Sequence, residues 1–144
     1  MTVFRCAGCG TAVTAELDEV PLPGEGPLPY EAEGECPPRI PPGGFAYDPE
    51  PSAFSWVPHT SPTSYRMPAG PTGSIVIGPD DVRGMTPTTD AGTRGGCCGP
   101  DGRGGPNMLC TGCSAALAIE SADCWTVRQI VLDPRRVVAD PSAP

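Results

Sequence analysis

Proline and glycine set the strongest limit on what this chain can fold into. Its 144 residues include 21 prolines and 19 glycines. Proline fixes φ and lacks an amide hydrogen, and glycine loses the most backbone entropy on folding, so this composition disfavours long helices. Only 38% of the residues are apolar and 6% aromatic, which leaves little apolar surface for each residue that is ordered. We therefore expect a mainly β, small single domain with long Pro/Gly-rich loops and a core that needs further stabilisation.

Short β-branched runs predict where the strands lie. They fall at residues 2–5, 11–14, 74–77, 115–120 and 125–133. The run 114–121 is short enough to form either a helix or a strand. In 125–133 the neighbours Val131 and Leu132 are both apolar, although they fall on opposite faces of a strand. This pattern predicts a strand that is partly covered on both faces.

Residues 21–71 form a proline-rich region with fourteen of the prolines. Because proline cannot donate to a β-ladder, we expect an extended insertion or loop region with short edge strands here. Disorder is the alternative. Aromatic residues favour partial order over disorder, because a disordered tract carries few of them. They are Phe45, Tyr47, Phe54, Trp56 and Tyr65.

Eight cysteines offer the further stabilisation, either as metal ligands or as disulfides. The first residues contain no apolar run as long as that of a signal peptide, and no stretch approaches the length of a membrane span. We therefore expect a cytoplasmic protein whose thiols stay reduced. Reduced thiols in Cys-x-x-Cys spacing favour bound zinc over disulfides.

Two segments have the pattern of a zinc knuckle, a tight turn in which two thiolates face one ion. They are Cys6-Ala7-Gly8-Cys9-Gly10 and Cys110-Thr111-Gly112-Cys113-Ser114. Glycine tolerates the tight backbone after the second cysteine, and the second copy departs from the pattern because Ser114 stands there. Two knuckles that each lead into a strand predict a zinc-ribbon-like site of Cys6, Cys9, Cys110 and Cys113. Residues 15–109 are then an insertion, and 1–144 is one zinc-stabilised domain.

The remaining cysteines leave other groupings open. Cys98, Cys110, Cys113 and Cys124 make a local site in one alternative, and Cys6 and Cys9 then join Cys97 or Cys36. A second zinc ion is also possible, held by Cys97 or Cys98 with Cys124 and either Cys36 or His59. The simplest reading of these extra cysteines is that some are plain buried or free thiols.

The same residues bear on whether the chain is an enzyme. A zinc ion with four thiolate ligands has no open position for a substrate, so we expect a structural metal and no catalytic residues. The vicinal pair Cys97 and Cys98 supports an alternative, a thiol-based redox or metal sensor. His59 is the only histidine. It leaves a weaker alternative, a hydrolase built in the proline-rich region.

The formal net charge of -8 is concentrated in one segment. Nine acidic residues against the single Arg39 lie between Glu16 and Glu50. An acidic surface repels phosphate backbones, which argues against direct nucleic-acid binding. The segment is either a solvated acidic loop or a surface that docks a protein partner.

Several runs of the sequence resemble a cysteine-rich family of Streptomyces and related actinobacteria. The resemblance covers nearly the whole chain, and its runs are 45–51, 82–84, 97–102, 105–107 and 123–134. All nine basic residues are arginine, as is usual in proteins from such GC-rich genomes. The resemblance implies one domain and a zinc-type cysteine set in which Cys36 is the least typical member. It implies no particular activity.

Overall fold

Short strands make up most of the part of the chain that the structure describes. A computed structural model describes residues 1–24, 37–50, 71–90, 94–95, 99–100, 102, 105–123 and 127–141. The strands are β1 (Thr2–Cys6), β2 (Asp18–Glu19), β3 (Gly44–Asp48), β4 (Ser74–Ile77), β5 (Met85–Pro87), β6 (Met108–Cys110), β7 (Ala116–Ser121), β8 (Gln129–Leu132) and β9 (Val137–Pro141). A three-residue 3-10 helix, Pro79–Asp81, follows β4. The mainly β fold expected from the composition is confirmed, and no helix of the described residues has the length and apolarity to cross a membrane.

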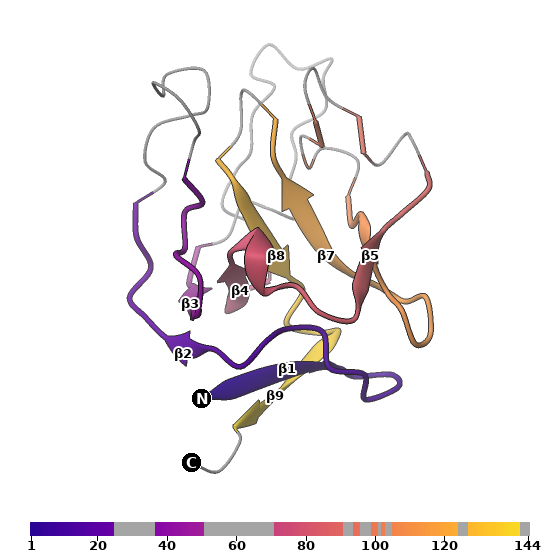
Figure 1. Cartoon of the computed structure of the whole chain (residues 1–144), viewed down its shortest axis with the longest axis horizontal. Coiled ribbons are helices and arrows are strands. Elements are labelled where there is room, and N and C mark those ends of the chain that lie inside the picture. The colour runs from indigo at the N-terminus through magenta and orange to yellow at the C-terminus, as the bar shows by residue number, and fades with distance from the viewer. Residues whose placement is uncertain are drawn as a thin grey trace.

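Seven of the strands form one sheet in the order β2-β3-β4-β8-β7-β6-β5 (Figure 1). Its neighbours pair antiparallel, except that β2 and β3 run parallel. The sheet ends at β5, which contains Pro87 and pairs only with β6 in this sheet. An edge strand tolerates proline because its outward amide needs no partner in the ladder. The hairpin of β6 and β7 therefore lies close to the β5 edge.

The strands β1 and β9 pair outside this sheet. Their register runs from Thr2 opposite Pro141 to Cys6 opposite Val137, which brings the two ends of the described chain side by side. In Figure 1 this pair lies below the large sheet, and both termini are at the same side. The pair carries Cys6 to the end of β1, where the first cysteine turn begins.

The main hydrophobic core lies between β1 and one face of the large sheet. Alternate strand residues point to the same face, so Ile75 and Ile77 of β4 are buried in this core together with Leu132 of β8. The ring of Phe4 in β1 meets the ring of Phe45 in β3 edge-on, with 5.0 Å between the ring centroids. This contact joins β1 to the sheet that it covers.

A second, smaller core covers the opposite face of the sheet. It contains the buried side chains of Ile40, Ala46, Val76 and Val131, with Val20 and Leu22 packed against it. Because β4 and β8 are covered on both faces, every residue of these two strands is buried. The strand expected to be partly covered on both faces is therefore found in β8.

The structure corrects or refines the strand predictions for three segments. Residues 11–14 form no continuous strand, because Val13 changes partners: its amide donates to Phe4 O, and its carbonyl accepts from the amide of Arg83. The ambiguous run 114–121 contains the strand β7. The strand β3 falls within the proline-rich region but is interior to the sheet, since β2 lies beside it. The edge position expected for strands there is wrong for β3.

Candidate metal centre

Four cysteines meet where two hairpin turns face each other. Cys6 is the last residue of β1 and Cys110 is the last residue of β6, and Cys9 and Cys113 follow in the turns. Their four sulfur atoms all lie within 4.8 Å of one another. The structure thus brings together the two Cys-x-x-Cys segments that are about a hundred residues apart in the sequence.

The two turns are built by the same hydrogen bonds. In the first, the amides of Gly10 and Cys6 donate to Cys6 O and Thr11 O over 2.8 and 2.9 Å. In the second, the amides of Ser114 and Cys110 donate to Cys110 O and Ala115 O over 2.8 Å each. Each cysteine turn therefore closes a hairpin in the same way, and the two hairpins are structural copies at this end.

The copies extend to the strands that flank them. Cys6 pairs with Val137 of β9, and Cys110 pairs with Met85 of β5. The residue after each of these cysteines donates its amide to the residue before that partner: Ala7 N to Arg136 O over 2.9 Å, and Thr111 N to Gly84 O over 3.0 Å. The two cysteine turns are therefore each attached to a flanking strand by the same pattern of pairing.

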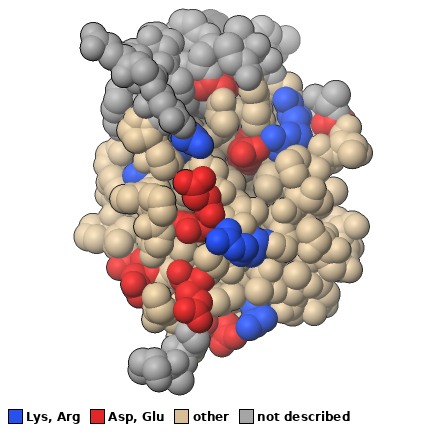
Figure 2. All heavy atoms as spheres, viewed as in Figure 1, with Lys and Arg blue, Asp and Glu red and all other residues tan. Residues whose placement is uncertain are grey.

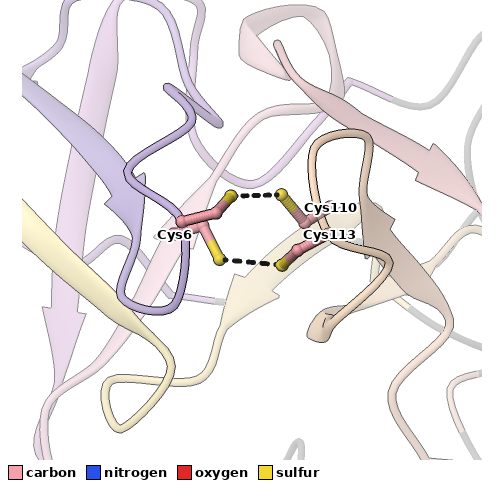
Figure 3. A group of neighbouring side chains, drawn as sticks. Cys6, Cys110 and Cys113 are labelled. Atoms are coloured by element: carbon pink, nitrogen blue, oxygen red, sulfur yellow. Dashed lines mark hydrogen bonds between the residues drawn. The ribbon is translucent and has the colours of Figure 1, made fainter.

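The sulfur atoms are spaced for a shared metal ion. Cys6 Sγ lies 3.6 Å from Cys113 Sγ, and Cys9 Sγ lies 3.5 Å from Cys110 Sγ. Figure 3 shows Cys6 facing Cys110 and Cys113 from the opposite turn. A disulfide requires about 2.05 Å between its sulfurs. Tetrahedral zinc with bonds of about 2.3 Å places its thiolates about 3.8 Å apart, so these residues fit a tetrahedral ion.

The four side chains differ in their access to solvent. Cys6 and Cys110 are buried at 2% and 1% exposure, whereas Cys9 and Cys113 are exposed. Each sulfur–sulfur contact across the turns joins one buried and one exposed cysteine. The inner half of the site is thus part of the core, and the outer half faces water.

Hydrogen-bonding groups surround the sulfurs and shift the pKa values of two of the thiols in opposite directions. The amide of Gly112 donates to Cys110 Sγ over 3.3 Å, and Thr11 Oγ1 lies 3.1 Å from Cys9 Sγ. Hydrogen bonds from the Thr11 side chain and amide lower the pKa of Cys9 to about 6. The amide of Ala115 lowers the pKa of Cys113, but its hydrogen bonding with Cys6, its partial burial and its contacts with Cys9 and Cys110 together raise it to about 11. Of these two exposed thiols, Cys9 therefore loses its proton more easily.

Glycine is required where the turns approach their surroundings. A Cβ atom on Gly112 would lie 2.3 Å from Thr11 Oγ1 and 3.0 Å from Cys9 Sγ. A Cβ atom on Gly84 would lie 2.1 Å from Ala12 O. The distances of 2.3 and 2.1 Å are shorter than real carbon contacts. The contact at Gly84 is with backbone and cannot be relieved by a side-chain rotation, so the hairpins can come together there only because residue 84 has no side chain.

One short segment links the two hairpins directly. Its residue Val82 bridges to Thr14 beyond the first turn, and Gly84 accepts from the second turn through Thr111 N. The buried carboxylate of Asp81, at the start of the segment, accepts a 2.9 Å hydrogen bond from the amide of Gly43. The position of the site therefore depends on residues 81–84 as well as on the cysteines.

The other predicted ligands lie outside the described residues. These are Cys97, Cys98 and Cys124, together with Cys36 and His59. The local grouping of Cys110 and Cys113 with Cys98 and Cys124 is disfavoured by the geometry, because both former sulfurs already lie against Cys6 and Cys9. A second site remains a sequence-based prediction.

Sequence reasoning missed the supporting residues of the site. Thr11 and Gly84 belong to no ligand motif, although Gly84 ends the run Val82-Arg83-Gly84, which resembles the actinobacterial family. A threonine two residues after a Cys-x-x-Cys pair is a usable signal, because its hydroxyl is within reach of the second sulfur. Nothing local in the sequence marks Gly84, whose constraint comes from Ala12, far away in the chain.

Comparison of the chain with protein-family models, with curated proteins and with solved structures gives no match. The resemblance to the actinobacterial family therefore stays a prediction.

Proposed function

We propose that Cys6, Cys9, Cys110 and Cys113 hold one structural zinc ion in a zinc-ribbon-like site, and that the folded chain is a non-catalytic protein-interaction module. The observation that carries the metal proposal is the spacing of the sulfurs, 3.5 and 3.6 Å across the turns. These values are close to the edge of a zinc–thiolate tetrahedron, about 3.8 Å. Soft thiolate ligands in this geometry select zinc or iron among common metals.

A structural role is supported by the completeness of the ligand set. Four thiolates fill a tetrahedral ion and leave no position for water or substrate. Two of the four are buried in the main core, so the ion would join the core to the two hairpin turns. Binding free energy at such a site is largely folding free energy. The ion would supply the stabilisation that a chain with few apolar residues needs.

A role in protein interaction is supported by an exposed acidic face. Glu16, Asp18 and Glu19 are exposed in and beside β2, and Asp80 is exposed in the 3-10 helix. The amide of Ala15 donates to Asp81 O, which places these two groups of residues next to each other. Figure 2 shows acidic side chains gathered along this face of the molecule. Such a face would steer a basic protein surface toward it.

Native mass spectrometry of the reduced, untagged protein tests the metal proposal. We expect at least one zinc ion per chain, and one ion fewer in Cys9→Ser. The variant Thr111→Ser is the matched control, because it changes the turn without removing a ligand, and its metal content should equal that of the wild type. Wild-type protein without metal, and with four freely titrating thiols at these positions, would contradict the proposal. A mass shift that corresponds to iron would correct the metal and keep the site.

Charge reversal tests the interaction proposal. A variant with Glu16→Arg, Glu19→Arg and Asp80→Arg reverses the charge of three of the four exposed carboxylates of this face and changes no buried residue. Crosslinking in the cells that produce the protein should yield a partner with wild-type protein, and the yield should fall at least tenfold with the variant. The control variant reverses the charge of Asp90, which is exposed but is not one of the four residues of this face. Equal yields from all three proteins would show that the acidic face does not dock the partner.

A further inference from the structure

We propose that this cysteine site is also a site of oxidation by hydroperoxides, at which disulfides form between the two turns. Cys9 and Cys113 react with the peroxide, and Cys110 and Cys6 then form disulfides with them. The pairs are Cys9–Cys110 and Cys6–Cys113. The release of zinc that accompanies the reaction depends on the proposed function, but the pattern of disulfides does not.

Access to solvent divides the four sulfurs into two roles. Cys9 and Cys113 are exposed, so a small peroxide can reach their sulfur atoms. Cys6 and Cys110 are buried in the main core, where a peroxide has to displace packed side chains to reach them. Thiol oxidation follows exposure and thiolate character, and a neighbouring thiol resolves the product. The exposed pair therefore reacts first, and the buried pair resolves.

Four cysteines can pair in three ways, and the short sulfur–sulfur contacts favour one of them. One alternative joins Cys6 to Cys110 and Cys9 to Cys113, and the other joins the cysteines of each turn, Cys6 to Cys9 and Cys110 to Cys113. The short contacts across the turns match neither alternative, with 3.5 Å between Cys9 and Cys110 and 3.6 Å between Cys6 and Cys113. Bond formation needs each pair to approach to about 2.05 Å, a movement of about 1.5 Å. The buried sulfur nearest to each exposed one belongs to the opposite turn.

The reaction is balanced with a hydroperoxide as the only oxidant. The Cys9 thiolate attacks one peroxide oxygen, the O–O bond breaks, and a sulfenic acid and an alkoxide or hydroxide form. The Cys110 thiolate then attacks the Cys9 sulfur, the S–O bond breaks, and hydroxide leaves as the S–S bond forms. The two thiolates together lose two electrons, and the peroxide gains these two electrons. Cys113 and Cys6 consume a second peroxide in the same way.

The proposed pattern preserves the joined hairpins while the metal leaves. Each thiolate that enters a disulfide ceases to be a ligand, so the ion is released. Disulfides across the turns then link the same two chain segments that the ion linked. Disulfides within the turns would leave the hairpins joined only by their packing. The cross-turn pattern therefore predicts an oxidised form that keeps its tertiary structure.

Peptide mapping after peroxide treatment distinguishes the patterns. Arginine-specific cleavage places Cys6 and Cys9 in the peptide 6–39, and Cys110 and Cys113 in the peptide 104–128. Zinc-loaded protein is treated with hydrogen peroxide, alkylated and digested without reduction. We expect these two peptides to be joined by disulfides, fragmentation to assign Cys9–Cys110 and Cys6–Cys113, and a zinc indicator to report release of about one ion per chain. The variant with Cys36→Ser and Cys124→Ser removes the other cysteines of these peptides and should give the same map.

Two threonine variants connect the reaction rate to the geometry. Thr11→Val removes the hydroxyl that contacts Cys9 Sγ. In the zinc-loaded protein the ion itself keeps the Cys9 sulfur deprotonated, so loss of the hydrogen bond leaves that thiolate more nucleophilic, and the release of zinc should be about two- to fivefold faster. Thr111→Val removes a hydroxyl that contacts Gly84 O and no sulfur, so its rate should equal that of the wild type.

The outcomes separate this proposal from the proposed function. Disulfides within each turn, with peptides 6–39 and 104–128 unlinked, would overturn it, and so would a map of Cys6–Cys110 and Cys9–Cys113. Peroxide treatment that leaves all four thiols reduced would also overturn it. If the protein binds no zinc, the zinc proposal fails, but the same mapping on the reduced protein still decides the disulfide pattern. Bound zinc that resists excess peroxide would overturn the oxidation site alone.

Discussion

Ser114 occupies the same place in the second cysteine turn as Gly10 does in the first, and both have a left-handed backbone. Their φ angles are 64° and 79°. Among the described residues Ser114 is the only residue other than glycine with a positive φ. The departure from the knuckle pattern seen in the sequence therefore leaves the turn geometry unchanged. The second turn stores the strain that glycine avoids in the first.

Ser114→Gly should stabilise the protein. An L-residue in the left-handed region destabilises the folded state by about 1–2 kcal/mol. Glycine removes this strain but gives the unfolded chain more entropy, which lowers the stability by about 0.4–1 kcal/mol. We expect a net gain of about 0.5–1 kcal/mol in the free energy of unfolding, measured by urea denaturation of the zinc-loaded protein.

The reverse exchange is its matched control. A Cβ atom on Gly10 would meet nothing within 4 Å, so Gly10→Ser tests backbone strain without a steric clash. It should destabilise the protein by a similar amount. If Ser114→Gly lowered the stability instead, the serine side chain would have to make a contact worth more than the strain.

Local residue types made much of this fold predictable. The β-branched runs indicated β1, β4, β7 and β8, because their strand preference and their burial agree. The paired Cys-x-x-Cys spacing indicated the two turns, because that spacing depends only on residues within each turn. The same reasoning left two groupings of the cysteines open, since the sequence does not state which turns meet.

The unpredicted features depend on contacts between distant residues. The strand β9 contains Pro141 and pairs with β1, so its place is set by the opposite end of the chain. The segment 11–14 looks like a strand but divides its hydrogen bonds between Phe4 and Arg83. Composition and periodicity describe each segment by itself and contain no information on such partners.

Gly84→Ala should destabilise the protein strongly. The new Cβ atom would lie 2.1 Å from Ala12 O, and the backbone φ of 55° is unfavourable for alanine. Because the obstacle is backbone and cannot rotate away, the two hairpins have to separate. We expect a loss of about 3 kcal/mol or more in the free energy of unfolding and a weaker zinc affinity, measured by competition with a chelator.

Gly24→Ala is the control for this variant. Nothing lies within 4 Å of a Cβ atom on Gly24, and its φ is not positive. The stability should therefore stay within about 0.5 kcal/mol of the wild type. Equal effects of the two alanines would show that Gly84 is not needed for the approach of the hairpins.

Asn107→Ala should also destabilise the protein, through a buried polar contact. The Asn107 side chain is fully buried and binds the backbone of Glu120 twice: its Nδ2 donates to Glu120 O over 3.1 Å, and its Oδ1 accepts from Glu120 N over 2.7 Å. This side chain takes the place of ladder hydrogen bonds at the irregularity between β6 and β7. Alanine leaves both backbone groups unpaired, which costs about 2–4 kcal/mol in urea denaturation.

Asn107→Asp distinguishes the contributions of the two hydrogen bonds, because it keeps one and removes the other. The carboxylate keeps the acceptor for Glu120 N but faces Glu120 O without a proton to donate. The loss should therefore be larger at pH 7 than at pH 5, where a buried carboxyl is more readily protonated. A loss that does not change with pH would indicate that the contact with Glu120 O contributes little.

Asp133→Asn should destabilise the protein at neutral pH but not in acid. Burial raises the pKa of Asp133, but hydrogen bonds from the side chain and amide of Arg135, with the charges of Arg135 and Arg136, outweigh it and hold the pKa below its usual value. A lowered folded-state pKa contributes stability that is complete above the unfolded value of about 3.9 and is lost as the pH falls through the folded value. The difference in unfolding free energy between wild type and variant should be about 1–3 kcal/mol from pH 7 to about 5, and should shrink below about 4.

The difference between the two proteins has to be measured because acid also protonates the cysteine thiolates and weakens zinc binding. That effect is common to wild type and Asp133→Asn at the same zinc concentration, so it cancels in the difference. Arg135→Gln removes the cationic partner and leaves the carboxyl in place. It should reduce the neutral-pH stability by less than Asp133→Asn, because the carboxylate keeps its negative charge, its 2.9 Å hydrogen bond from the Arg135 amide and the nearby charge of Arg136. A difference between wild type and Asp133→Asn that persists unchanged to pH 3 would mean that the charge of Asp133 is not what stabilises the turn before β9.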